Sequence, residues 1–375
     1  MKIKHHPTSP PEIGQPLAEH TRSAMRISYA LRRVPASSVR RLLPAPELPQ
    51  VGDIVLARVE TIGKNVALDL ATGRRCALHP GDLIAVVFGN RYATLQFEGY
   101  ARSEGDRCDL LSVGGLCGVV ASKHDTVPEP SRLRIEGALG NGDGRPLRLQ
   151  DFAVPEGARV GHGRPRIVVV LGTAMDVGKT YTARSVIHGL GRAGLQVAGV
   201  KLTGTAAGRD TFAMLDAGAC AALDFVDGGL PSTYLCALSD LLALYRRLVD
   251  HAAGQGAAWV VAEIADGIIQ GETAALLAST RFATSVDAWL LAANDALGVV
   301  GAVGLLSPLG IRPLAVSGIV SRSPLGRREV EASTQIPCLT AAELEEGGLN
   351  HRLNAAAPPR GLKVLSGEQP AVTLG

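Results

Sequence analysis

The chain has 375 residues and a formal net charge of +3, with charges of both signs along its length. This length predicts two domains, and the balanced charge does not favour an obligate nucleic-acid-binding protein. The six cysteines form no Cys-x-x-Cys pair and no cluster with histidine, so we expect neither a disulfide framework nor a zinc site. The N-terminus lacks the apolar segment of a signal peptide. We therefore expect a cytoplasmic protein without a membrane span.

The first third of the chain predicts a small β domain behind an N-terminal arm. Residues 1–46 are rich in Pro, Ser and Arg with little hydrophobic periodicity, and we expect an irregular arm there. Residues 47–126 contain short alternating segments between turn-forming residues. They predict a small antiparallel β-barrel-like domain, whose ligand the sequence does not identify. Recurring Pro and Gly in residues 127–160 predict a connector to the next domain.

Residues 161–346 alternate apolar strand-like segments with helix-like ones. Strands that are apolar on both faces require a parallel sheet that is covered by helices on both sides. The sequence therefore predicts an α/β domain with a doubly wound, mostly parallel sheet, and then a C-terminal tail over residues 347–375. In such sheets, ligands bind beyond the carboxyl ends of the strands.

The segment VVVLGTAMDVGKTYTA, residues 168–183, combines an apolar strand, a loop with glycines and the start of a helix. A phosphate-binding loop needs glycines where the backbone approaches the anion, a lysine for the outer phosphates and a hydroxyl for Mg²⁺. Gly172, Gly178, Lys179 and Thr180 supply these parts, in a loop one residue longer than G-x-x-x-x-G-K-[ST]. The sequence therefore predicts a P-loop NTPase domain that binds a nucleotide and Mg²⁺.

The longer loop, G-T-x-x-x-V-G-K-T, resembles that of the dethiobiotin synthetase family of ATP-dependent enzymes. In VAGVKLTGTAAGRDTF, Lys201 and Asp210 match the lysine that ends the family's second strand and the aspartate that begins its next helix. In VVAEIADGI, Glu263 matches a later strand end. Ser321 and Arg322 lie where the family has an asparagine that faces the adenine.

The resemblance implies a ligase-type or kinase-type enzyme that uses ATP and Mg²⁺ to phosphorylate a carboxylate or carbamate of a small-molecule substrate. Lys179 and Lys201 would be catalytic, and the magnesium ligands would be Thr180, Asp210 and Glu263. The residues expected at the nucleotide are Gly172, Thr173, Asp176, Val177, Gly178, Lys179, Thr180, Tyr181, Ser321 and Arg322. A homodimer is left open. The loop has Ala174-Met175 where the family has an Asp-Thr pair that helps to position its diamine substrate.

Two other classes of function fit parts of the sequence. One is a nucleotide-hydrolysing switch or metal-insertion chaperone, which includes a circularly permuted GTPase. Ser122-Lys123-His124-Asp125 is similar to the [NT]-K-x-D motif that recognises guanine, although its first residue is Ser. The other is a non-catalytic nucleotide-binding adaptor whose barrel recruits a partner. A switch would show slow hydrolysis that a protein partner accelerates, an enzyme would depend on a small molecule, and an adaptor would show neither.

Overall fold

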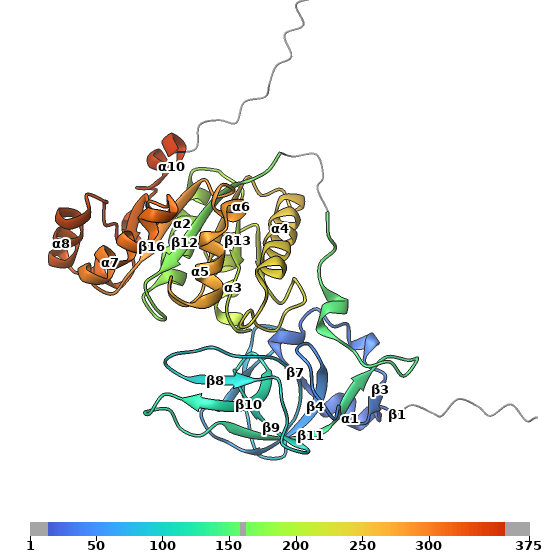
Figure 1. Cartoon of the computed structure of the whole chain (residues 1–375). Coiled ribbons are helices and arrows are strands. Elements are labelled where there is room, and N and C mark those ends of the chain that lie inside the picture. The colour runs from blue at the N-terminus through green and yellow to red at the C-terminus, as the bar shows by residue number, and fades with distance from the viewer. Residues whose placement is uncertain (1–13, 158–162, 357–375) are drawn as a thin grey trace, which may run out of the picture.

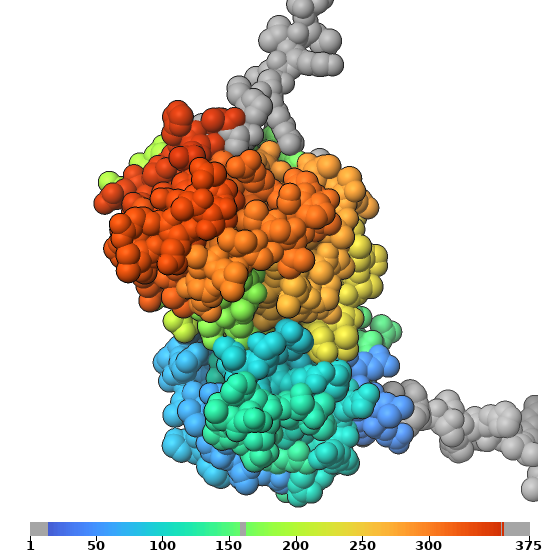
Figure 2. Space-filling view, turned by 60° about the vertical axis from the view of Figure 1, so that its left-hand side comes forward, coloured from blue at the N-terminus to red at the C-terminus, as the bar shows by residue number. Residues whose placement is uncertain are grey.

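The computed structural model describes residues 14–157 and 163–356. They form a barrel domain, which is blue to green at the bottom of Figure 1, and an α/β domain above it. The space-filling view shows the barrel domain packed directly beneath the α/β domain (Figure 2). We use these two names for the domains below.

The α/β domain is built on a six-stranded sheet in which all strands are parallel, in the order β14-β13-β15-β12-β16-β17. The doubly wound, parallel fold that the sequence predicts is therefore confirmed. The strands are β12 (Arg166–Gly172), β13 (Val197–Lys201), β14 (Ala221–Asp224), β15 (Trp259–Glu263), β16 (Ala288–Ala292) and β17 (Ala315–Ser317).

Helices cover both faces of this sheet because its strands are apolar on both sides. Ile167 and Val169 of β12 join one apolar core, and Val168 and Val170 join the other. The helices are α2 (Lys179–Arg192), α3 (Gly208–Asp216), α4 (Leu238–Gly254), α5 (Gly271–Ala278), α6 (Thr280–Ala283), α7 (Ala296–Leu306), α8 (Pro324–Thr334), α9 (Ala341–Glu345) and α10 (Asn350–Ala356).

The barrel domain is a closed sheet. Successive pairings run from β4 to β7, β10, β9 and β11 and then back to β4, and they enclose a separate apolar core. Most pairs are antiparallel as predicted, but β7 and β10 pair in parallel. The strands are β4 (Ile54–Thr61), β5 (Ala67–Asp69), β6 (Arg75–Ala77), β7 (Leu83–Phe88), β8 (Phe97–Tyr100), β9 (Arg107–Leu110), β10 (Leu116–Lys123) and β11 (Ser131–Gly140).

The predicted connector over residues 127–160 is wrong for most of its length. It contains β11, which pairs with β4, β9 and β3 (Arg41–Leu43) and closes the barrel. Leu133 and Ile135 alternate with Arg132 and Arg134 in this strand, so a period of two was present between the Pro and Gly residues. The short helix η3 (Leu149–Phe152) follows, and residues 158–160 lie outside the described part of the chain.

The predicted N-terminal arm is more regular than expected within the described residues, which begin at position 14. It has short elements that pack on the barrel, since β3 pairs with β11 and β2 pairs with β7. These elements are β1 (Gln15–Pro16), α1 (Glu19–Ala24), β2 (Arg26–Ile27), η1 (Tyr29–Leu31), η2 (Ala36–Ser38) and β3. The tail that we expected from residue 347 begins with α10, and Leu349 and Leu353 are buried in the core of the α/β domain. Residues 357–375 lie outside the described part.

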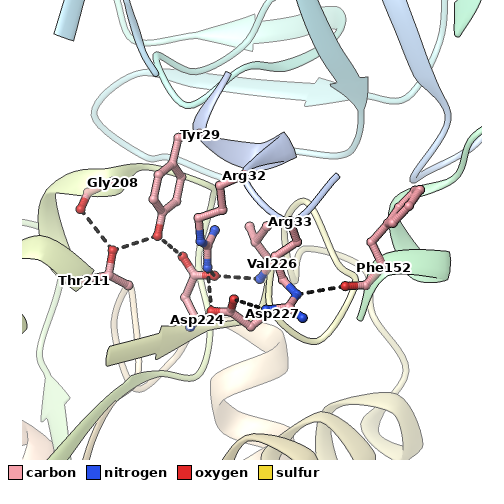
Figure 3. Close-up of polar contacts among 9 residues, drawn as sticks. All are labelled: Tyr29, Arg32, Arg33, Phe152, Gly208, Thr211, Asp224, Val226 and Asp227. Atoms are coloured by element: carbon pink, nitrogen blue, oxygen red, sulfur yellow. Dashed lines mark hydrogen bonds and ion pairs between the residues drawn. The ribbon is translucent and has the colours of Figure 1, made fainter. Parts of the chain in front are cut away.

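The two domains share a buried polar cluster, made by Tyr29 and Arg32 of the arm with Asp224 and Asp227 of the α/β domain (Figure 3). The guanidinium of Arg32 lies 2.8 Å from Asp224 and 2.5 Å from Asp227. The Tyr29 hydroxyl donates to Asp224 at 2.7 Å and lies 2.7 Å from the hydroxyl of Thr211. Apolar packing continues around this cluster, so one core spans both domains.

Within residues 14–157 and 163–356, no helix combines the length and the apolar composition needed to cross a membrane.

The polar cluster generates a stability prediction. Arg32→Ala removes the nearest cation of two buried carboxylates and leaves only Arg33, 3.7 Å from Asp227, so we expect a loss of about 3 kcal/mol in the free energy of unfolding. The matched control is Arg107→Ala, which removes exposed ion pairs with Glu60 and Asp106 and is expected to cost clearly less stability than Arg32→Ala. Urea denaturation of the full chain measures both values. Equal, small losses in the two variants would contradict a stabilising role of the cluster.

Candidate functional site

The loop between β12 and α2 depends on two glycines. A Cβ atom on Gly172 would lie 2.6 Å from Cδ of Lys179, so a larger residue would displace the lysine. Gly178 has φ of 96° and precedes the first residue of α2. A Cβ there would also come within 3.0 Å of the Gly318 backbone. Both positions therefore require glycine for this course of the chain.

Three other loop residues make hydrogen bonds that anchor the loop. The Thr173 N–H donates to Ala292 of β16, and the Val177 carbonyl accepts from Ile319. Gly172 accepts from Ile268, and the Val177 side chain is fully buried. These three residues are expected at the nucleotide, and Gly172, Thr173 and Val177 are not among the residues that line the adjacent cavity. Their contact with a nucleotide stays a prediction.

The loop opens into a cavity of about 410 Å³. Asp176, Gly178, Lys179, Thr180 and Tyr181 line it, as the sequence predicts for residues at a nucleotide. Asp176 has a positive φ of 60°, an uncommon conformation for a residue other than glycine. Such backbone conformations are concentrated at ligand-binding loops.

The predicted magnesium ligands lie together at one end of this cavity. The Thr180 hydroxyl is 3.0 Å from Oε1 of Glu263 and 3.3 Å from Oδ1 of Asp210. Lys201 makes an ion pair with Asp210, and its Nζ lies 3.6 Å from Oε1 of Glu263. Four predicted residues are thus brought into mutual contact by the ends of strands β13 and β15 and by helices α2 and α3.

This oxygen-rich set fits a magnesium ion. Glu263 is only 2 % exposed, and its Oε2 has no hydrogen-bond partner among the described residues. A buried carboxylate oxygen without a partner is costly unless a cation or donor reaches it. No group of three or more His, Cys, Asp or Glu side chains in the described ranges could hold a metal ion. That is compatible with Mg²⁺, which uses one or two carboxylates together with nucleotide phosphates and water.

Lys179 is almost fully buried, at 7 % exposure, and its Nζ donates to the Ala174 carbonyl at 2.6 Å. Burial lowers the pKa of Lys179, and the negative charges of Glu263 and Asp266 partly oppose this. An ammonium ion in this position is stabilised by any anion that enters the cavity.

A second cavity of about 190 Å³ lies against the first, since Gly178 and Tyr181 line both. Ser321 and Arg322, the residues that we expected near the base, line the second cavity. The Ser321 hydroxyl donates to the Gly318 carbonyl, and the Arg322 guanidinium lies 5.8 Å from the centre of the Tyr181 ring. The residues that line this cavity include no carboxylate.

The segment Ser122-Lys123-His124-Asp125, which is similar to the guanine-recognition motif, lies in the barrel domain. Ser122 and Lys123 end β10 of the barrel, where the Ser122 hydroxyl donates to Glu98 at 2.8 Å and Lys123 donates to the Val127 carbonyl at 2.9 Å. Asp125 follows in the next turn and lines neither of the two cavities. The motif is therefore not positioned to contact a base in the second cavity.

Sequence reasoning missed one wall of the main cavity, which the barrel supplies through Arg91, Tyr92, Ala93 and Gln96. These residues lie in the loop between β7 and β8 and reach the α/β domain only through the docking of the two domains. No local pattern in the sequence marks them. Asp266, which follows the Glu263 strand, also lines the cavity, and burial raises the pKa of its carboxyl.

A strand, a glycine loop that ends in Gly-Lys-Thr, and a helix on a parallel sheet define the fold. The α/β domain has the fold of P-loop NTPases.

No family model matches the chain, and no curated protein matches it. Among solved structures it is similar to the signal recognition particle 54 kDa protein from Aeropyrum pernix in complex with GDP, with 20 % identity and a TM-score of 0.37 over 53 % of this chain and 48 % of that one. Chloroplast FtsY from Physcomitrella patens has 14 % identity and a TM-score of 0.34, with 51 % and 62 % covered. A DUF1611 family protein from Anabaena variabilis has 13 % identity and a TM-score of 0.37, with 56 % and 63 % covered. The chain thus spans less than two thirds of each of these three structures.

The loop lysine generates the next prediction. Lys179→Ala removes a cation from the phosphate-binding position, and we expect nucleotide turnover to fall by about 10²–10³-fold. The fold should remain, because the side chain makes one hydrogen bond and its buried charge is unfavourable. Turnover assays and thermal unfolding measure the two effects. Lys64→Ala, at an exposed barrel position, is the control, and equal turnover in the two variants would contradict the phosphate role of Lys179.

Proposed function

We propose that the protein is a Mg²⁺–ATP-dependent enzyme of the ligase or kinase type, which transfers the γ-phosphoryl group of ATP to a carboxylate or carbamate of a small metabolite. The supporting observation is the convergence of Lys179, Lys201, Thr180, Asp210 and Glu263 on one cavity that continues to a wall from the barrel. We expect the acceptor to bind between this wall and the phosphates of the nucleotide. The resemblance of the loop and strand ends to dethiobiotin synthetases supports the choice of acceptor.

The proposed transfer is a substitution at phosphorus. An oxygen of the acceptor forms a bond to the γ-phosphorus, while the bond between that phosphorus and the oxygen bridging to the β-phosphate breaks and ADP leaves. Lys179 and Lys201 would stabilise the charge on the transferred group. Thr180, Asp210 and Glu263 would hold Mg²⁺, which supplies charge neutralisation at the phosphates. The mixed anhydride formed in this way can react with an amine, which displaces inorganic phosphate and gives an amide from a carboxylate or a urea from a carbamate.

The second cavity supports ATP as the nucleotide. Recognition of guanine requires an acceptor for its N1–H and 2-amino groups, and a carboxylate is the usual one. The second cavity offers the Ser321 hydroxyl and the Arg322 guanidinium, without a carboxylate. These groups suit a base that is held by stacking and one or two hydrogen bonds.

A nucleotide-hydrolysing switch is the second candidate, because the site is linked to the domain interface. Asp210 is followed in α3 by Thr211, whose hydroxyl lies 2.7 Å from the hydroxyl of Tyr29 in the polar cluster. A change at Asp210 on nucleotide hydrolysis could therefore alter how the barrel is held. In that case a protein partner, rather than a small molecule, would control turnover.

The experiment that separates these candidates measures nucleotide turnover by the purified full chain with Mg²⁺. ATP and GTP are compared, alone and with a panel of small carboxylates and of amines with bicarbonate. We expect one acceptor class to raise ATP turnover at least about tenfold, and ATP to be favoured over GTP by about 1–2 kcal/mol, as when one or two hydrogen bonds decide the choice. A preference for GTP with no response to any small molecule would contradict the enzyme proposal and favour the switch.

Glu263 tests the metal assignment. Glu263→Gln keeps the shape of the side chain but removes its charge, so we expect the Mg²⁺ concentration for half-maximal turnover to rise about tenfold. Nucleotide binding without Mg²⁺ should change little. The control is Glu329→Gln, at an exposed position of α8. Superimposable Mg²⁺ titrations for Glu263→Gln and the control would show that Glu263 is not a metal ligand.

A further inference from the structure

Arg91 is a buried cation whose charge the described residues only partly satisfy. It is 7 % exposed, yet it lines the main cavity. Its Nη2 donates to Oε1 of Gln96 at 2.7 Å, while Nε and Nη1 have no hydrogen-bond partner among the described residues. The structure gives it no ion pair within the described ranges, and Asp266 is the acid whose charge acts on it. Burial lowers the pKa of Arg91 to about 10, so the guanidinium remains charged at neutral pH.

The loop that carries Arg91 is held in place from both domains. Its backbone pairs with Gly99 of β8 through two hydrogen bonds of 2.8 and 3.0 Å. On the opposite side, the Ser232 hydroxyl of the α/β domain donates to the carbonyl of the preceding residue, Asn90. The rings of Tyr92 and Tyr234 then pack at 5.4 Å between their centres. Arg91 is therefore held in the cavity wall. Because its loop is held from both sides, the guanidinium stays buried and does not move into solvent.

We propose that Arg91 binds an oxygen of the terminal phosphoryl group of the nucleotide, as a third cation beside Lys179 and Lys201. The proposal rests on the binding of a nucleoside triphosphate at the proposed site, but it holds for either acceptor, a metabolite or water. All three cations line the same cavity, where the charge of Asp266 acts on each of them. Charge that builds on the phosphoryl oxygens during transfer would be stabilised from the barrel side by the guanidinium.

This role explains why the barrel lies over the carboxyl edge of the sheet. A buried guanidinium without a full set of partners destabilises the folded protein. Such a group is expected at functional sites, where a ligand supplies the missing partner. The terminal phosphoryl group carries the negative charge that the described residues do not supply to Arg91 through an ion pair.

The test compares binding of Mg–ADP and of the non-hydrolysable Mg–AMPPNP by calorimetry to the full-length wild type, Arg91→Met and the control Arg102→Gln, an exposed barrel arginine over the Tyr100 ring. We expect Arg91→Met to weaken AMPPNP roughly ten- to a hundredfold, as for loss of hydrogen bonds to a charged group, and to leave ADP within about twofold. Arg91→Lys, which keeps the charge without the planar fork, should be intermediate.

Thermal unfolding provides a second, independent measurement. If Arg91 serves a ligand, Arg91→Met should unfold at the same temperature as the wild type or higher without nucleotide, and should lose the extra stabilisation that AMPPNP gives over ADP. Equal weakening of ADP and AMPPNP, or unchanged affinity for both, would overturn the proposal. So would a large drop in the unfolding temperature with no change in the ratio of the two affinities. A wild type that binds ADP and AMPPNP as expected but does not turn over ATP would contradict the proposed function alone.

Discussion

The position of the barrel depends on one buried interaction, the contact of Arg32 with Asp224 and Asp227. Burial opposes the charge of Arg32, but the two carboxylates outweigh this and raise its pKa. Burial, together with the neighbouring Asp224, raises the pKa of Asp227. The Tyr29 hydroxyl and the Val226 N–H donate to Asp224, and the Arg33 guanidinium lies 3.7 Å from Asp227, which helps to offset the repulsion between the two acids. Charges buried in this way are paired in only one arrangement of the two domains. They therefore specify the orientation of docking in addition to stabilising it.

That docking determines the composition of the site. Asp224 ends β14, so the barrel is fixed at the carboxyl edge of the sheet, where the strand ends of β13 and β15 carry Lys201 and Glu263. Thr211 joins the same network one residue after Asp210. The loop with Arg91 is tied to the α/β domain through Ser232. A site that would be open above a bare sheet thus becomes a cavity with walls from two domains.

The sequence predicted the parts of the site that follow from local pattern and sheet geometry. A glycine loop followed by Lys179 and Thr180 is recognisable as a P-loop from the sequence alone. Lys201 and Glu263 could be placed beside it because parallel strands end at one edge of the sheet. The strand β11 was missed because Pro and Gly on either side outweighed the alternation of Leu133 and Ile135. The cavity wall that contains Arg91 could not be predicted, because Arg91 is far from Lys179 in the sequence. Only the docking of the two domains brings them to one cavity. The anchoring of Thr173 and Val177 also required the structure, since it depends on strand β16 and on Gly318.

Closure by the barrel has a consequence for the chemistry. Burial in the cavity wall lowers the pKa of Lys179 and of Arg91, and the same burial strengthens the interaction of each cation with an anion. The two buried charges therefore destabilise the protein unless an anion binds beside them. The P-loop side chains come from the α/β domain, whereas Arg91 and the rest of the opposite wall come from a barrel with its own core. Because the two walls belong to separate units, substitutions of barrel-loop residues other than Arg91 can reshape the cavity while the P-loop stays the same.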